Sequence, residues 1–337
     1  MINFSHLHEW FKLPDETKVR IFAETSKQIG LPSPPTAEKD WWVVHTLSVI
    51  FSLKCANALI FKRGTSLSKA WNLIQRFSED IDLVLDREFL GFTGELSKND
   101  VKKLRRKSYQ FITETFTEEL KNKFSELGFK EVTVKYREVE NHDQDPLIIE
   151  IYYNKLTETD TYIKPGVLVE IGSRSLKEPF TQRTFGTMTS EVFAGKPFSD
   201  NPITIPVVNP ERTFLEKIFL LHEEFQKDTS KIRYRRLSRH LYDIEKISQT
   251  DFATTALQNT DLYYTIVEHR SKFTKIQGVD YANHKPENIK FVPPANLLPL
   301  WEKDYQDMRE SMLYGETLNF EELIKRLTEL QKRINSI

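Results

Sequence analysis

Two aspartates separated by one residue are the first candidates for chemistry in this sequence. Asp80 and Asp82 begin a segment, 80–86, in which charged and apolar residues alternate for most of its length. This alternation predicts a half-buried strand, with both carboxylates on one face and Ile81 and Leu83 on the other. Two carboxylates this close repel each other unless a cation lies between them, and hard oxygen ligands favour Mg²⁺. Mg²⁺ ions held there would activate a hydroxyl and stabilise the leaving oxygen in phosphoryl transfer.

A short turn upstream provides groups that suit a phosphate. The turn 63–66 lies between an apolar run, 58–61, and a helix-like stretch, 67–74. Gly64 lets backbone N–H groups approach an anion, the hydroxyls of Thr65 and Ser66 can donate to it, and the following helix offers its positive end. The alternative is that Gly64 only makes a turn and that the two aspartates are solvated residues on an exposed strand face.

These stretches carry a family resemblance. Gly64-Thr65-Ser66-Leu67-Ser68-Lys69 and Arg76-Phe77-Ser78-Glu79-Asp80-Ile81-Asp82-Leu83 resemble the signature of the AbiEii/AbiGii nucleotidyltransferase toxins, a branch of the DNA polymerase β-like nucleotidyltransferase superfamily. Weaker similarity extends through 212–217 and 239–244. The resemblance implies that Asp80 and Asp82 bind Mg²⁺ and that the triphosphate is held by Gly64, Thr65, Ser66 and Lys69. Arg63 is a departure, because family members commonly have a second glycine there. An arginine would either crowd the turn or add a phosphate contact.

A third carboxylate is expected on a neighbouring strand, as in other enzymes of this superfamily. Glu170 is the candidate, because it lies inside the apolar run 167–171, where an acid is costly to bury unless it is paired or bound to metal. If Glu170 faces Asp82, it can also act as the base for the attacking hydroxyl. The alternatives are that Glu170 pairs with Arg174 or reaches solvent.

Two further candidates follow in the second half of the chain. The resemblance places Lys217 where a family lysine contacts the nucleotide phosphates; the alternative is a solvated lysine paired with Glu216 or Glu224. It also includes Asp243 as a catalytic residue that positions Lys217 or the acceptor, although His240 replaces the first acid of the family's pattern. Arg239 and Asp243 are four residues apart, so a simple surface pair on a helix is the other interpretation.

Composition limits the other possibilities. The chain has 337 residues and a formal net charge of -1, so any polyanion must be attracted by a local patch. Two basic clusters, 102–107 and 233–239, are candidates; a solvated helix face is the simpler interpretation of the first, and the second is favoured for nucleic acid. A single cysteine, Cys55, excludes an internal disulfide and fits a reducing compartment. The sequence shows no P-loop, no dinucleotide-binding motif, no signal peptide and no membrane-spanning run, which indicates a soluble cytoplasmic protein.

The hydrophobic periodicity and the positions of glycine, proline and capping residues predict an α+β fold. Helices are expected at 15–29, closed by Gly30, at 38–56 after a proline-rich break, and at 99–127, capped by Ser97 and ended by Gly128. Strands are expected at 130–137, 146–153, 167–171 and 202–208, and helices at 210–225, 234–247, 261–272 and 317–334. With the resemblance, this becomes a polymerase-β-like nucleotidyltransferase core with a mixed sheet flanked by helices in 1–208, including N-terminal helices, followed by a helical C-terminal domain in 209–337.

The function that follows is a nucleotidyltransferase. It would move a nucleoside monophosphate from a nucleoside triphosphate to an acceptor with the help of Mg²⁺. The resemblance further suggests an RNA acceptor, with the 3′ end of tRNA as one candidate, and a bacterial toxin controlled by an antitoxin protein or acting in phage defence. Two alternatives stay open: a catalytically silent protein of the same fold that binds nucleotide or a partner, and a metal-dependent nuclease that uses the same acids.

Overall fold

The structure is a computed structural model that describes residues 2–142, 144–158, 166–173, 179–274 and 276–336. Contacts within the chain divide it into two compact units. The first consists of Met1–Trp71 and Phe77–Val208, and the second of Asn72–Arg76 and Asn209–Ile337. The short segment Asn72–Arg76 therefore belongs to the second unit, although it connects two elements of the first.

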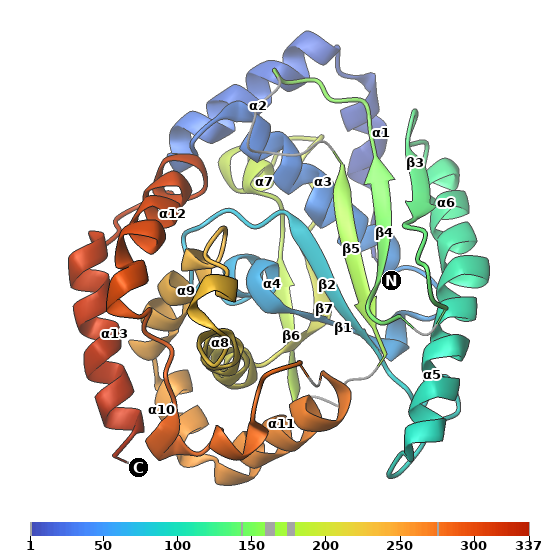
Figure 1. The fold of residues 1–337 in the computed structure, drawn as a ribbon. Helices are drawn as coiled ribbons and strands as arrows, with labels where there is room; N and C mark the ends of the chain where they lie inside the picture. The colour runs from blue at the N-terminus through green and yellow to red at the C-terminus, as the bar shows by residue number, and fades with distance from the viewer. Residues whose placement is uncertain (1, 143, 159–165, 174–178, 275, 337) are drawn as a thin grey trace. The chain divides into compact units, whose positions relative to one another are not determined.

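The first unit is built on one mixed sheet. Among the described residues, seven strands are ordered β3-β4-β5-β2-β1-β7-β6 (Figure 1). The central pairs β2·β5 and β1·β7 are parallel, and the others are antiparallel. The strands are β1 (Leu59–Lys62), β2 (Asp80–Leu85), β3 (Thr133–Tyr136), β4 (Leu147–Tyr152), β5 (Val167–Gly172), β6 (Phe180–Phe185) and β7 (Ile203–Val208). The predicted α+β class with a mixed sheet flanked by helices is confirmed.

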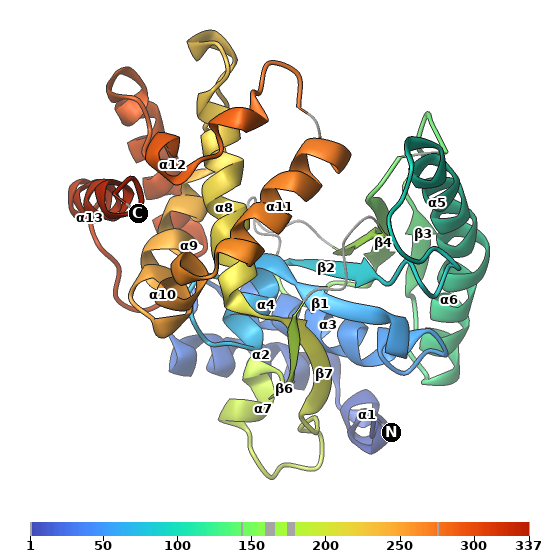
Figure 2. The ribbon, with the colours of Figure 1, turned by 90° about the horizontal axis from the view of Figure 1, so that it is seen from below.

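Helices cover one face of this sheet. The helices of the unit are α1 (Ser5–Lys12), α2 (Asp15–Ile29), α3 (Pro34–Ile50), α4 (Arg63–Lys69), α5 (Lys98–Gln110), α6 (Thr117–Glu126) and α7 (Met188–Val192). Figure 2 shows α3 running along the sheet, where it contacts β2 and β5. Ile81 and Leu83 of β2 and Val169 of β5 are almost completely buried. Asp82 and Val84, on the other face of β2, are also buried, so the strand predicted to be half-buried is mostly buried on both faces. The other face of these two strands carries the acidic residues.

Helix α3 begins earlier than the sequence analysis expects. Pro34 and Pro35 form its first turn and do not break the chain, because a proline there lacks only an N–H that the helix would leave unpaired. The helix ends at Ile50, before the predicted 56. Its first half buries three charged side chains, Glu38, Lys39 and Asp40, each at most 2% exposed. Burial of this kind requires partners, and two of them lie close to the acidic strand, as described below.

The long charged helix is confirmed and continues through an irregular segment. Helix α5 joins α6 through a π-helical segment, Phe111–Phe116. Ser97 caps α5 as predicted: its hydroxyl accepts from the Asp100 amide, and the Asp100 carboxylate accepts from the Ser97 amide. The helix ends at Glu126, and Gly128 follows with a positive φ of 84°.

Strand β6 has no counterpart among the predicted elements. Its sequence, Phe180–Phe185, reads FTQRTF, and its first five residues are exposed or half-buried. It lies at the edge of the sheet and pairs only with β7. An edge strand of this composition shows no hydrophobic alternation, so local periodicity does not detect it.

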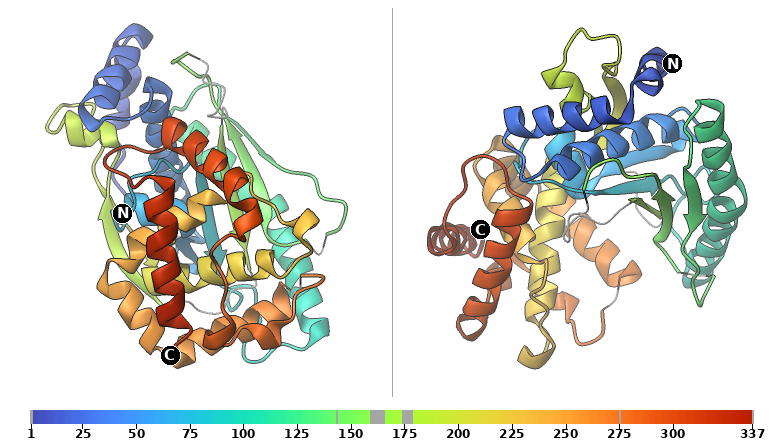
Figure 3. Two further views of the ribbon diagram at one scale, coloured as in Figure 1. Left: turned by 60° about the vertical axis from the view of Figure 1, so that its left-hand side comes forward. Right: turned by 90° about the horizontal axis from the view of Figure 1, so that it is seen from above.

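The second unit is helical. It contains α8 (Pro210–Phe225), α9 (Ser238–Ser248), α10 (Asp251–Gln258), α11 (Thr260–Phe273), α12 (Leu298–Ser311) and α13 (Phe320–Ile334), coloured from yellow to red in Figure 3. Short 3₁₀ turns lie at Thr229–Lys231, Tyr281–Asn283, Pro286–Asn288 and Ala295–Leu297. Helices α8 and α9 pack against each other, and α9 also contacts α12 and α13. Their apolar residues recur at helical spacing and are buried, as at Phe214, Ile218 and Leu221 in α8. None of the described helices is long and apolar enough to span a membrane.

Candidate active site

The paired strands β2 and β5 bring two acidic side chains together. Asp82 and Glu170 are partners in the parallel register, and Asp80 lies opposite Leu168. Because partners in register share a face, Asp82 and Glu170 leave the sheet side by side, and Asp80 leaves it on the same side. The Asp82 side chain is 11% exposed and that of Glu170 is 32% exposed. The expectation that Glu170 faces Asp82 is therefore confirmed, whereas Arg174 lies outside the described residues.

One cationic nitrogen bridges this acid pair. Nη1 of Arg63 donates to Oδ1 of Asp82 at 2.5 Å and to Oε2 of Glu170 at 2.9 Å. Arg63 directly follows Lys62, the last residue of β1. Lys62 pairs with Asp82, so Arg63 begins beside the acid pair. Sequence reasoning considered that Arg63, in place of a glycine, would crowd the turn or add a phosphate contact, and did not predict a contact with the acids. Its contact with both acids depends on the sheet register, which the sequence does not reveal.

The surroundings of Glu170 shift its pKa upward. Burial is the largest cause, and the negative charge of Asp82 adds to it, while the guanidinium of Arg63 partly opposes both. Within the described part of the chain, no three His, Cys, Asp or Glu side chains are grouped closely enough to hold a metal ion. The predicted ligands thus form a pair, Asp82 and Glu170, with Asp80 on the same face but outside the pair. Two hard carboxylate donors that already share one cation fit a divalent ion such as Mg²⁺.

The predicted turn is the first turn of α4, which starts at Arg63 and ends at Lys69. Its hydroxyls are used within the protein. Thr65 donates to the Asp80 carbonyl, its hydroxyl oxygen lies 2.8 Å from that of Ser78, and Ser66 donates to the Arg63 carbonyl at 2.8 Å. The Thr65 contacts fasten the beginning of α4 to the beginning of the acidic strand, and the Ser66 bond closes the turn itself. Thr65 and Ser66 therefore stabilise the turn through their side chains. Gly64 lies between Arg63 and Thr65 in the chain.

Lys69 is not brought to the acid pair. Its ammonium lies 2.7 Å from Oδ1 of Asp40 in α3, and both side chains are buried. A second buried ion pair joins Lys39 of α3 to Glu79, with 3.7 Å between charged atoms. These pairs tie α3 to the two segments that border the candidate site, α4 and the residues before β2. They also explain why α3 buries charged residues in its first half.

In the second unit, Asp243 is the centre of a buried cluster. Arg76 donates to it through Nε at 2.7 Å and through Nη2 at 2.8 Å, and the ammonium of Lys217 lies 2.8 Å from its Oδ2. Asp243 is fully buried, which excludes a simple surface pair with Arg239. Sequence reasoning missed Arg76 as a partner of Asp243. The available signal was its position within the motif 76–83.

The cluster has strongly perturbed ionisation. Burial alone would raise the pKa of Asp243, but the charges and hydrogen bonds of Arg76 and Lys217 outweigh it and hold that pKa well below its usual range. The pKa of Lys217 is lowered, chiefly by burial, and Asp243 opposes the change. His240 lies beside Lys217, with 3.5 Å between Nδ1 and Nζ, and its pKa is lowered by burial and then by the charge of Lys217. Because His240 is then neutral, it adds no positive charge next to the neighbouring cations.

Comparison with known proteins decides the family. The family model described as "Nucleotidyl transferase AbiEii toxin, Type IV TA system" matches residues 50–326, which is most of the chain. The chain belongs to this family. Its activity is therefore nucleotidyl transfer, as the signature residues indicated, and membership of a type IV toxin–antitoxin system implies a nucleotide substrate and an antitoxin partner.

The fold of this AbiEii family member also has a counterpart among solved structures. Among solved structures, the chain is similar to MenT4, a nucleotidyltransferase toxin from Mycobacterium tuberculosis H37Rv. The two share 16% sequence identity and a TM-score of 0.46, over 94% of this chain and 98% of the other. No curated protein matches the sequence significantly.

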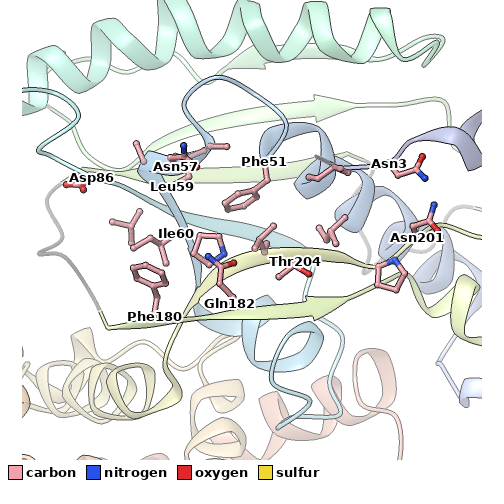
Figure 4. Close-up of a pocket in the computed structure, with 18 residues that line it drawn as sticks. Asn3, Phe51, Asn57, Leu59, Ile60, Asp86, Phe180, Gln182, Asn201 and Thr204 are labelled. Atoms are coloured by element: carbon pink, nitrogen blue, oxygen red, sulfur yellow. The ribbon is translucent and has the colours of Figure 1, made fainter.

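One cavity of the first unit lies away from the acid pair of this AbiEii toxin. It has a volume of about 640 Å³ and is lined by residues of β1, β6 and β7, including Leu59, Gln182 and Thr204 (Figure 4). Leu59 pairs with Leu85, at the opposite end of the β1–β2 ladder from Asp82. None of the predicted site residues lines this cavity.

The first basic cluster of this AbiEii toxin is open to solvent. Lys102, Lys103, Arg106 and Lys107 of α5 are all exposed. In the second cluster, Arg233 is bound to Glu224 through two side-chain hydrogen bonds, at 3.1 and 2.7 Å. Arg233 and Arg235 of the second cluster are exposed as well, and Lys103 of the first lies 3.8 Å from Asp100, so both clusters display positive charge to solvent.

Proposed function

We propose that this protein transfers a nucleoside monophosphate from a nucleoside triphosphate to a hydroxyl of an RNA acceptor, in a reaction that depends on Mg²⁺. Among possible RNA acceptors, we propose the 3′ end of tRNA. The reaction takes place in the cytoplasm, where triphosphates and tRNA are abundant.

The observation that carries this proposal is the shared cation of Asp82 and Glu170. Two carboxylates on adjacent strands hold one positively charged nitrogen between them, so the position is built for positive charge. When bound there, Mg²⁺ would supply charge neutralisation for the reacting phosphate and activation of the acceptor hydroxyl. Asp80, on the same face of β2, lies outside this pair, so the proposed ligands in the structure are Asp82 and Glu170. Glu170, whose pKa is raised, is the proposed acceptor of the hydroxyl proton.

Binding of the triphosphate is assigned to the beginning of α4. Gly64 lets the backbone come close to phosphate oxygens, and the contacts of Thr65 with Ser78 and with the Asp80 carbonyl keep this backbone at a fixed distance from the acidic strand. The buried lysines Lys69 and Lys217 are left out of this assignment, because Asp40 and Asp243 already pair with them.

Recognition of RNA is assigned to the exposed basic residues of α5. Phosphate contacts from lysine and arginine give affinity that depends on salt but not on sequence. The exposed side chains Lys102, Lys103, Arg106 and Lys107 supply such contacts on a protein whose overall charge is close to neutral. This surface therefore supports an RNA acceptor rather than a small-molecule acceptor.

Incubation with labelled nucleoside triphosphates and total RNA tests the proposal. We expect label transfer and pyrophosphate release that stop with EDTA and fall by at least a hundredfold in Asp82→Asn and Glu170→Gln. Asp86→Asn, just after the far end of β2, is the matched control and should retain activity. Nucleotide binding without transfer would point to a silent binding protein, and RNA shortening without added triphosphate would point to a nuclease; either result would refute the proposal.

A further inference from the structure

Arg63 occupies the place between the two acids that the proposed reaction gives to a metal ion. A single nitrogen, Nη1, contacts both carboxylates, at 2.5 Å and 2.9 Å. The arginine side chain is 46% exposed, whereas Asp82 is 11% exposed. The guanidinium of Arg63 thus belongs to a long, partly solvated side chain. The two acids that it neutralises are carried by strands of the sheet.

The backbone at Arg63 is unusual for a residue with a side chain. Its φ is 65°, in the left-handed region that glycine adopts without a steric penalty. A residue with a Cβ atom is disfavoured there, so this conformation persists only where the surrounding contacts compensate for it. For Arg63 those contacts include the charge-assisted hydrogen bonds to Asp82 and Glu170, which are the strong kind.

The acid pair cannot bind Arg63 and a divalent ion in the same way at once. The oxygens Oδ1 of Asp82 and Oε2 of Glu170 already point at the guanidinium, and a metal ion needs the same lone pairs. Without either cation, two negative charges would face each other in a half-buried place. With Arg63 in place, the pair keeps a net charge of about -1, which attracts a divalent ion less than an uncompensated pair does.

We propose that Arg63 is an internal counter-ion of the acid pair, which a divalent cation must displace, and that Arg63 thereby sets the Mg²⁺ concentration at which the site is loaded. This inference rests on the proposed function, in which Asp82 and Glu170 bind Mg²⁺. It gives Arg63 a positioning role: it holds the two carboxylates together in the metal-free protein and gives up the place when the metal ion binds.

The test measures binding of Mn²⁺ alone to the full chain by electron paramagnetic resonance, with no nucleotide present. Arg63→Gln keeps a polar side chain but shortens it and removes its charge, and Arg63→Gly also frees the backbone. We expect both variants to bind Mn²⁺ at least tenfold more tightly than the wild type, because the competing cation is gone. Arg87→Gln, which removes a charge from a half-buried arginine just after β2, is the matched control and should leave the affinity unchanged.

A second measurement follows the melting temperature. In EDTA, Arg63→Gln should melt at a lower temperature than the wild type, and Mg²⁺ should raise the melting temperature of the variant more than that of the wild type. If Arg63→Gln folds only with Mg²⁺, that recovery supports the proposal, and a failure to recover overturns it.

The possible results separate this inference from the proposed function. Equal Mn²⁺ affinity in the wild type and both Arg63 variants, with binding lost in Glu170→Gln, would overturn the role of Arg63 and leave the metal site intact. Absence of Mn²⁺ binding from the wild type and both Arg63 variants would overturn the proposed metal site and the inference together.

Discussion

Replacement of Asp243 by asparagine should destabilise the second unit strongly. The carboxylate is fully buried and neutralises two buried cations, Arg76 and Lys217, through three contacts of 2.7 to 2.8 Å. Asparagine keeps the shape but removes the charge, so both cations would face a neutral amide. Breaking a buried ion pair by removing one partner typically costs about 3–5 kcal/mol. Folded proteins have a total stability of about 5–15 kcal/mol, so we expect much of the stability of this protein to be lost.

Urea denaturation followed by circular dichroism measures the effect. The midpoint for Asp243→Asn should shift to lower urea with an unchanged slope, which signals a change in stability alone. Asp228→Asn is the matched control, because Asp228 forms an exposed pair with Lys231 at 3.3 Å, and its midpoint should stay in place. Arg76→Met combined with Asp243→Asn should cost clearly less than the sum of the two single changes, since they share one interaction. A cost below about 1 kcal/mol for Asp243→Asn, or additive single changes, would refute the reasoning.

The pH dependence of Asp243 has a definite sign. Because its folded pKa lies below the ordinary value of 3.8, the carboxylate contributes stability above that value and loses it as the pH falls toward the folded pKa. Acid unfolding of the wild type should therefore include a component below about pH 4. That component should be absent from Asp243→Asn when unfolding is followed from pH 5 to pH 2.

Three further predictions concern the first unit. Burial lowers the pKa of His6 to about 4, from 6.5, so the neutral histidine contributes stability above pH 6.5 that is lost as the pH falls toward 4. In His6→Asn the melting temperature should therefore change less with pH between 6.5 and 4. An unchanged dependence of the melting temperature on pH would contradict the assignment. Ser97→Ala removes the cap of α5 and should cost about 1 kcal/mol in urea denaturation, whereas Ser336→Ala, near the C-terminus, should cost nothing measurable. Replacement of Lys102 and Arg106 together by glutamine should weaken RNA binding and reduce its salt dependence by about two phosphate contacts, with nucleotide binding unchanged in a filter-binding assay; an unchanged salt slope would exclude α5 from the RNA surface.

Local chemistry made several features predictable from the sequence. The alternation in 80–86 indicated a strand with acids on one face, and β2 has Asp82 on the opposite face from Ile81. The Ser97 cap and the start of α8 at Pro210 follow from side-chain and backbone preferences that act within one helical turn. Each of these signals involves residues that are neighbours in the chain.

Such short-range signals could not predict features that depend on residues far apart in the chain. Arg63 and Glu170 are 107 positions apart, and Arg76 and Asp243 are 167 apart. Lys69 looked like a phosphate ligand because of its position in the motif, but a buried carboxylate on α3 binds it. Strand β6 exists because β7 offers it backbone partners, and its own side chains carry no hydrophobic alternation.

The sequence by itself determined the family, the class of fold and the residue types available for phosphoryl chemistry, because these are recorded in short motifs and in periodicity. Only the tertiary structure decided which charges meet. Opposite charges attract through space, and the sheet register and helix packing set which of them come within 3 Å, so Arg63 joins Asp82 and Glu170, and Asp243 holds Arg76 and Lys217.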